Sequence, residues 1–170
     1  LDRYAEENRE DFFKGVIAPD LYKKPESHYG EASSAPGLEK FRNCVGLTVS
    51  FNRGYYFHLK TDLLFYNDFL DNHCISNELY HDYDCLNQAV IDRYHLNIPS
   101  EIRPFLGFSK QNPQILHEDE LFLFIDFVGN LALEELPQPG EITYQLGRLQ
   151  YEEYIKIDCG KKENALERAG

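Results

Sequence analysis

The most regular pattern in the sequence is an apolar stripe that runs through residues 77–96. Apolar residues follow one another there at intervals of three or four positions: Leu79, Tyr83, Leu86, Val90 and Tyr94. Such intervals bring side chains to one face of an α-helix, which has about 3.6 residues per turn. His81 falls on the opposite face. The sequence therefore predicts a helix over residues 77–96 with its apolar face in the core and His81 facing water.

A second pattern, in residues 44–61, is typical of a β-hairpin. In the stretch CVGLTVSF, large apolar residues occupy every second position. This alternation predicts a strand with one apolar face made of Val45, Leu47, Val49 and Phe51. NRG at 52–54 is typical of a turn. YYFHLKT then predicts a returning strand, with Phe57 and Leu59 inward and with His58 and Lys60 outward.

Three further segments predict strands and complete the expected fold. ELFLFIDFVG at 120–129 is apolar at both parities, which is typical of a strand covered on both faces. EITYQLG at 141–147 and LQYEEYIKIDC at 149–159 follow it. The sum predicts an α+β fold, with a mainly antiparallel sheet of about five strands and two or three helices packed on one face.

The length of 170 residues fits one domain. We expect a single domain over residues 1–170 in four parts. These parts are an N-terminal helix at 1–16, an irregular wrapping segment at 17–43, an α+β core at 44–159 and a polar tail at 160–170.

The chain is strongly acidic, because 29 Asp and Glu against 17 Lys and Arg give a formal charge of −12. Such a surface repels phosphate groups, so we expect no nucleic-acid binding. It attracts a basic protein and speeds their encounter. The longest apolar run, LFLFI at 121–125, is far shorter than the roughly 20 residues of a membrane helix, so we expect no membrane insertion.

Two acidic segments are candidates for binding a protein partner. Glu118, Asp119 and Glu120 lead into the apolar run, and Glu152 and Tyr154 share the outward face of a predicted strand. Tyrosine suits contact surfaces because its ring is apolar and its hydroxyl is polar. These five residues predict a partner-binding surface; the alternative is that both segments are simply solvated.

The four cysteines predict disulfide bonds. A bridge from Cys74 to Cys85 would hold the start of the helix, and one from Cys44 to Cys159 would join the ends of the sheet; three pairings of four cysteines are open. The absence of Met and the even number of cysteines favour an exported protein, secreted or periplasmic. The alternative is a cytoplasmic protein with free thiols.

His81, followed by Asp82 and Asp84, is the one histidine–carboxylate arrangement that suggests catalysis. A carboxylate can orient a histidine that acts as a general base. The six histidines form no His-x-x-x-His or His-Glu-x-x-His unit, and no phosphate-binding glycine loop occurs, so we expect no metal and no cofactor.

The sequence thus favours a non-enzymatic protein-binding module, such as an inhibitor, an immunity-type protein or an accessory subunit. The alternatives are a small hydrolase that uses His81 with Asp82 or Asp84, and a structural subunit of a larger assembly.

Overall fold

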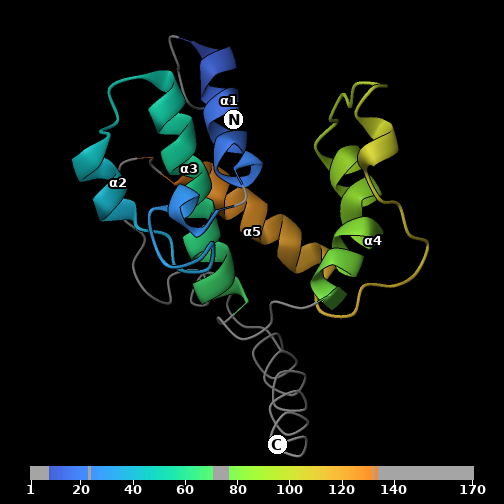
Figure 1. The fold of residues 1–170 in the computed structure, drawn as a ribbon. Helices are drawn as coiled ribbons and strands as arrows, with labels where there is room; N and C mark the ends of the chain where they lie inside the picture. The colour runs from blue at the N-terminus through green and yellow to red at the C-terminus, as the bar shows by residue number, and fades with distance from the viewer. Residues whose placement is uncertain (1–7, 23, 71–76, 132, 134–170) are drawn as a thin grey trace, which may run out of the picture. The chain divides into compact units, whose positions relative to one another are not determined.

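Five α-helices make up most of the part of the chain that the structure describes (Figure 1). The computed structural model describes residues 8–22, 24–70, 77–131 and 133. The α-helices are α1 (Arg9–Leu21), α2 (Leu38–Cys44), α3 (Ser50–Leu64), α4 (Asn77–Arg93) and α5 (Glu118–Asn130). Two short 3-10 helices, η1 (Pro25–His28) and η3 (Arg103–Phe105), and a π-helix, η2 (Phe65–Phe69), complete these elements.

The predicted α+β fold is wrong. No β-strand occurs in the described ranges, where the only strand-like pairing is an isolated bridge between Ala32 and Ala35. Residues 50–64 and 118–130, which include the returning strand of the hairpin and the strand at 120–129, are helical. The strands predicted at 141–147 and 149–159 lie outside the described residues.

The chain divides into two compact units. The first unit contains residues 1–72 and 126–145, and the second contains 73–125 and 146–170. The single domain over residues 1–170 stays a prediction. None of the helices in the described ranges is long and apolar enough to span a membrane.

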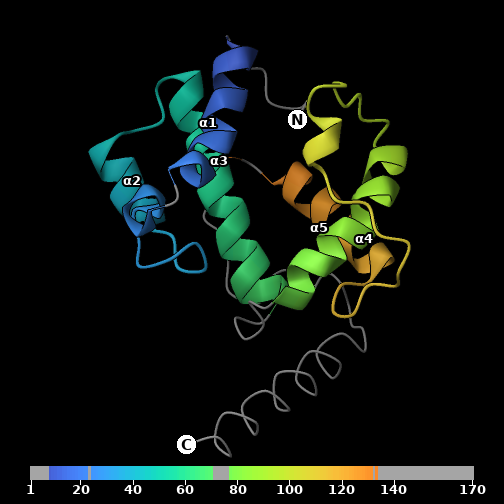
Figure 2. The same cartoon turned by 45° about the vertical axis from the view of Figure 1, so that its right-hand side comes forward.

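In the first unit, α1 packs against α3 through two glycines, and both views show these helices side by side (Figures 1 and 2). A Cβ on Gly15 would collide with the carbonyl oxygen of Phe51, and one on Gly54 would collide with that of Phe12. Only glycine therefore lets the two backbones approach so closely. The adjacent core consists of Ala18, Leu38, Phe41, Tyr55, Tyr56, Leu59 and Leu133.

The burial pattern of α3 explains why the hairpin prediction failed. Tyr55, Tyr56, Leu59 and Lys60 are buried, so burial recurs at a spacing of four residues and not of two. Lys60, predicted to point outward, is thus on the buried face. Gly54, taken as a turn residue, is in fact the point of contact with α1. The alternation of residues 45–49 falls in the connection between α2 and α3.

The N-terminal helix ends later than predicted, and residues 1–7 of that prediction lie outside the described residues. Asn8 caps α1, since its side-chain Oδ1 accepts a hydrogen bond from the backbone N–H of Asp11 at 3.0 Å. The helix continues past Gly15 to Leu21, because Gly15 lies at the contact with α3 and does not end the helix. The segment predicted to be irregular, 17–43, therefore holds the end of α1, all of η1 and most of α2.

In the second unit, the predicted helix is confirmed as α4, which ends at Arg93 and not at residue 96. Leu79 and Leu86 are buried, as the stripe requires, and Asp82 is buried between them. The hydroxyl of Tyr94 donates a hydrogen bond to the carbonyl oxygen of Phe122 at 3.3 Å, and the two rings meet edge to face. Phe122 belongs to α5. The sequence of this segment predicted a strand, because its apolar residues occupy both odd and even positions.

Candidate functional site

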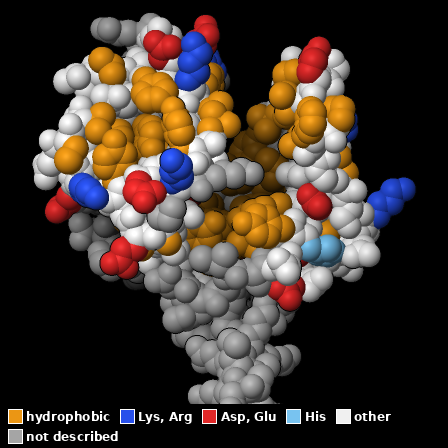
Figure 3. Space-filling model, in the orientation of Figure 1, with side chains coloured by type: hydrophobic (Ala, Val, Ile, Leu, Met, Phe, Trp, Pro, Cys, Tyr) orange, Lys and Arg blue, Asp and Glu red, His pale blue; other side chains and the backbone are white. Residues whose placement is uncertain are grey.

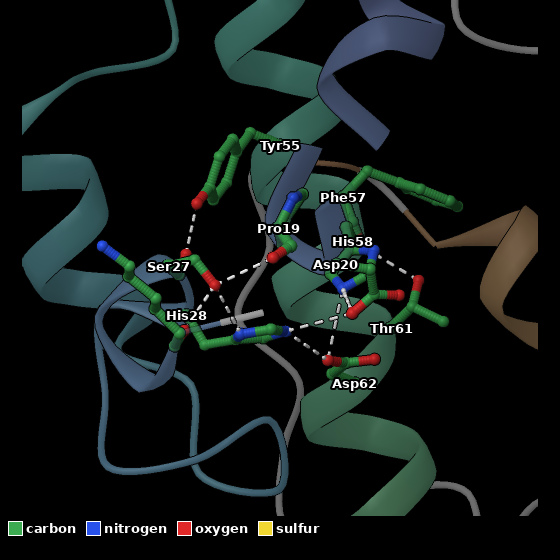
Figure 4. A network of polar contacts seen from close by, with 10 residues as sticks. Pro19, Asp20, Ser27, His28, Tyr55, Phe57, His58, Thr61 and Asp62 are labelled. Carbon is green, nitrogen blue, oxygen red and sulfur yellow. Dashed lines mark hydrogen bonds and ion pairs between the residues drawn. The ribbon is translucent and has the colours of Figure 1, made fainter. Parts of the chain in front are cut away.

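Two histidines and two aspartates converge in the first unit (Figure 4). Asp20 lies in the last turn of α1, His28 ends η1, and His58 and Asp62 lie one turn apart on α3. We call these four residues the His28–His58 cluster. Their convergence depends on the α1–α3 contact and on the segment that carries η1 back onto both helices.

The two imidazoles face the same carboxylate oxygen. Nε2 of His28 lies 3.2 Å from Oδ2 of Asp62, and Nε2 of His58 lies 3.3 Å from the same atom. Oδ1 of Asp20 is 3.7 Å from each Nε2 atom. Ligand atoms of Asp20, His28 and His58 thus lie within 4.8 Å of one another, and Oδ2 of Asp62 lies within 3.3 Å of both imidazole nitrogens.

The imidazole of His28 is held in a defined orientation by Ser27. The Ser27 hydroxyl oxygen lies 3.1 Å from Nδ1 of His28, and it also lies 2.8 Å from the carbonyl oxygen of Pro19 and 2.7 Å from that of Lys24. Since the single hydroxyl proton goes to a carbonyl, the hydroxyl oxygen accepts the proton of Nδ1. Nε2 of the neutral ring then carries a lone pair directed at the carboxylates.

His58 lies on α3, and its ring is largely buried beside the carboxylates of Asp62 and Asp20. Burial lowers the pKa of His58, but the interaction with Asp62, the charge of Asp20 and the backbone carbonyl of Val16 outweigh it, so the pKa lies above its ordinary value of 6.5. The site therefore favours a positive charge.

The Nε2 atoms of His28 and His58 are both buried, and neither makes a hydrogen bond. Buried polar nitrogens are nearly always satisfied, so each such atom requires an explanation. Protonation of both imidazoles would give each nitrogen an ion pair with Asp62, but it would place two positive charges against one carboxylate oxygen, on rings whose centroids are 5.4 Å apart. A metal ion accepts lone pairs from both imidazoles and from the carboxylates at once.

The distances from Asp62 to the two imidazole nitrogens fit a metal ion. Tetrahedral ligands with bonds of about 2.0–2.1 Å lie about 3.3–3.4 Å apart. The two distances to Asp62 are 3.2 and 3.3 Å. Imidazole nitrogen and carboxylate oxygen together suit zinc, iron(II) and similar divalent transition metals.

The histidine predicted as a catalytic base belongs to a second arrangement, in the second unit. His81, Asp82, Cys85 and Gln111 form the His81 cluster. Nδ1 of His81 lies 3.2 Å from Oδ1 of Asp82, and its Nε2 lies 2.8 Å from Oε1 of Gln111. Both ring nitrogens are thus engaged, and His81 is half-buried, not fully turned to water.

Asp82 has a structural role in the second unit. The backbone N–H groups of Gln114, Ile115 and Leu116 donate to its two carboxylate oxygens. Its side chain is completely buried, so the carboxylate fixes the chain before α5 to α4. Asp84 is exposed and acts on His81 through its charge. A hydrolase built on His81 stays a prediction, but this geometry leaves neither ring nitrogen free to act as a base.

The predicted disulfides are wrong. Cys44, at the end of α2, is an exposed free thiol, and Cys85 on α4 is a half-buried free thiol. Sγ of Cys85 lies 3.7 Å from both ring nitrogens of His81, one helical turn away. The proposed partners, Cys74 and Cys159, lie outside the described residues. Export stays a prediction.

Three of the predicted partner-binding residues form the first turn of α5. Glu118 and Asp119 are exposed and Glu120 is half-buried. Acidic side chains in this position complement the partial positive charge of a helix N-terminus, which gives them a structural role besides any binding role. Glu152 and Tyr154 lie outside the described residues.

Sequence reasoning missed the His28–His58 cluster, although one signal for half of it was present. His58 and Asp62 are four residues apart, which places them on the same face of a helix. The sequence pattern predicted a strand over residues 55–61. In a strand, where side chains alternate with a period of two, a spacing of four residues does not indicate that two side chains meet. No pattern in the sequence joins Asp20 and His28 to this pair.

Comparison with known proteins gives no relative from which a function could be transferred. No protein-family model matches the chain, and neither the curated proteins nor the solved structures contain a significant match. The function must therefore be argued from the geometry of the site.

Proposed function

We propose that this protein binds one divalent transition-metal ion, such as Zn²⁺, through His28, His58 and Asp62, with Asp20 beside them. The observation that carries the proposal is that two buried Nε2 atoms, neither of them hydrogen-bonded, face one carboxylate oxygen at 3.2 and 3.3 Å. Burying two lone pairs against an anion costs free energy unless a cation lies between them.

The surroundings of the cluster support the same proposal. Protein ligands to metals are usually oriented by outer hydrogen bonds, and histidine ligands commonly donate their second ring N–H to an oxygen. The Ser27 hydroxyl does this for His28. The ligands would also join α1, η1 and α3, so metal binding would stabilise the folded first unit.

Calorimetric titration of the full chain with Zn²⁺ tests the proposal. We expect one site per chain, and we expect His28→Ala and His58→Ala each to weaken binding by more than the roughly 10- to 100-fold that loss of an outer-shell partner costs. His117→Ala is the control, because it removes an exposed imidazole of the second unit that belongs to neither cluster. Equal binding by all four proteins would contradict the proposal.

The second candidate function is binding of a basic protein, and a loop of the second unit favours it. Hydrophobic side chains reach the surface of each unit (Figure 3), and Phe105, at the end of η3, is 86% exposed beside the exposed Ile102. Hydrogen bonds from Asn87 to the carbonyl of Gly107 and from Ser109 N–H to the carbonyl of Asp84 tie this loop to α4. An exposed aromatic ring on a pre-organised loop is typical of a binding hot spot.

The charge of −12 selects a basic protein as the partner for this loop. Affinity purification with the native chain and with Phe105→Ala tests this candidate. We expect the substitution to remove the captured protein, whereas Phe13→Ala, which truncates a partly exposed phenylalanine of the first unit, should retain it. Capture that is indifferent to salt would exclude the contribution of charge.

A further inference from the structure

The four residues of the His28–His58 cluster are not equivalent. The side chains of His28, His58 and Asp62 are 7%, 12% and 19% exposed, whereas that of Asp20 is 74% exposed. Asp20 is also more distant, at 3.7 Å from both Nε2 atoms. Three ligands are thus fixed inside the first unit, and the fourth stands on the solvent side.

We infer that the metal site is of the open type: His28, His58 and Asp62 hold the ion, and the coordination position beside Asp20 exchanges and accepts water or a small anion. This inference rests on the proposed metal site and adds to it the class of ligand that the site takes. Structural zinc sites use four protein ligands, whereas sites that bind or activate a ligand use three and leave one position to water or substrate.

The charges of the site favour an anion at the exchangeable position. A divalent ion bound by two neutral imidazoles and the carboxylate of Asp62 keeps one net positive charge. Asp20 neutralises this charge when it binds, and an external anion does so when Asp20 turns away into solvent. Because an exposed aspartate loses little by returning to water, a small anion can compete with it.

The mobility of a ligand depends on what else holds its side chain. His28 is held by the Ser27 hydroxyl, which in turn contacts the carbonyl oxygens of Pro19 and Lys24. The carbonyl oxygen of Ser27 also accepts a hydrogen bond from the Tyr55 hydroxyl. His58 and Asp62 share α3. Asp20 projects from the last turn of α1 toward the two imidazoles (Figure 4), and its side chain is 74% exposed. The exchangeable position is therefore on the Asp20 side.

Cobalt(II) and azide provide the test, because Co²⁺ reports its coordination in its visible absorption spectrum. The full chain is loaded with one equivalent of Co²⁺ and titrated with sodium azide. We expect a saturable change in the visible bands. We expect Asp20→Ala to bind Co²⁺ with a loss no larger than the roughly 10- to 100-fold of an outer-shell substitution, and to bind azide more tightly than the native chain.

Glu10→Ala is the matched control, since it removes an exposed carboxylate from the other end of α1 and should change neither Co²⁺ nor azide binding. If Asp20→Ala loses Co²⁺ as completely as His28→Ala, and azide leaves the native spectrum unchanged, the site is closed and this inference is wrong while the proposed function stands. If the native chain binds Co²⁺ no better than His28→Ala does, the proposed function itself fails.

Discussion

Each unit of this protein contains a histidine beside an aspartate, and the two pairs differ in what already occupies their polar atoms. In the His81 cluster, Asp82 accepts three backbone N–H groups, and Nε2 of His81 is bonded to Gln111. In the His28–His58 cluster, two buried Nε2 atoms make no hydrogen bond. The same residue types thus have a structural role where backbone groups satisfy their polar atoms. Where backbone groups do not, the polar atoms are available to a ligand.

The physical reason for the difference is which groups face each carboxylate: backbone N–H groups in one cluster and only side chains in the other. Asp82 faces a connecting segment whose backbone N–H groups are not used by a helix or a sheet, so the carboxylate and the segment satisfy each other. Asp20, His28, His58 and Asp62 come from elements whose backbone groups are mostly used within helices. Only side chains meet at their common point, and these side chains provide more acceptors than donors.

The largest expected effect separates the two aspartates in the metal-free protein. Asp82→Ala should lower the free energy of unfolding by about 3–5 kcal/mol, because it leaves several buried N–H groups without an acceptor. Asp62→Ala should cost about 1 kcal/mol or less at pH 8, where it removes no backbone hydrogen bond. Urea denaturation measures both. Amide hydrogen exchange at Ile115 and Leu116 should accelerate only in Asp82→Ala; similar losses in both variants would contradict the comparison.

The next effect concerns the outer shell of the His28–His58 cluster. Ser27→Ala should weaken Zn²⁺ binding roughly 10- to 100-fold, since His28 loses the acceptor that fixes its tautomer. Ser109→Ala is the matched control, because the Ser109 hydroxyl accepts the backbone N–H of Gln111 in the second unit. Calorimetric titration of both variants gives the ratio of affinities. Unchanged affinity in Ser27→Ala would mean that Ser27 does not orient His28.

A smaller effect tests how each cluster depends on its scaffold. Gly54→Ala should cost about 1–3 kcal/mol of unfolding free energy and weaken Zn²⁺ binding, because the added methyl group forces α1 away from α3. Gly129→Ala, where nothing lies within 4 Å of the added Cβ, should raise stability by up to about 1 kcal/mol. Thermal denaturation measures both changes. Normal metal binding by Gly54→Ala would show that the cluster does not need the close helix contact.

The smallest effect is the pH response of the His81 cluster. The hydrogen bonds to Gln111 and to Asp82 raise the pKa of His81 above 6.5. The stabilisation from protonated His81 is therefore complete below its unfolded pKa of about 6.5 and is lost as the pH rises through the higher folded pKa. NMR titration of the imidazole should give a midpoint above 6.5, and Gln111→Ala should lower it. A native midpoint at or below 6.5 would show that these bonds do not favour the charged ring.

The sequence was most informative where one local period decided the structure. The stripe from Leu79 to Tyr94 predicted α4 because each of its positions supports the same helical face. The same spacing could have located the buried carboxylate, since Asp82 follows Leu79 by three residues and precedes Leu86 by four. The polarity of Asp82 argued against a buried position, because aspartate is rarely buried without dedicated partners. Those partners lie about 30 residues further along the chain.

The sequence misled where a residue type has two uses. Gly54 was taken for a turn, but glycine also occurs where two helix backbones meet, and only the position of α1 distinguishes the two. Consecutive aromatic residues at 55–57 fill a strand or a broad helix face equally well. With a strand predicted there, Lys60 was expected to point outward. The four-residue spacing of His58 and Asp62 no longer indicated that they share a helix face.

From the sequence alone came the helix α4, predicted to residue 96 and observed to Arg93, the acidic charge and the candidate pairing of His81 with Asp82. The tertiary structure decided which carboxylate is saturated and which histidines lack hydrogen bonds, because satisfaction of a buried polar atom depends on partners remote in the chain. Asp20 and Asp62 are 42 positions apart, and only the folding of α1, η1 and α3 against one another places them beside the same two imidazoles.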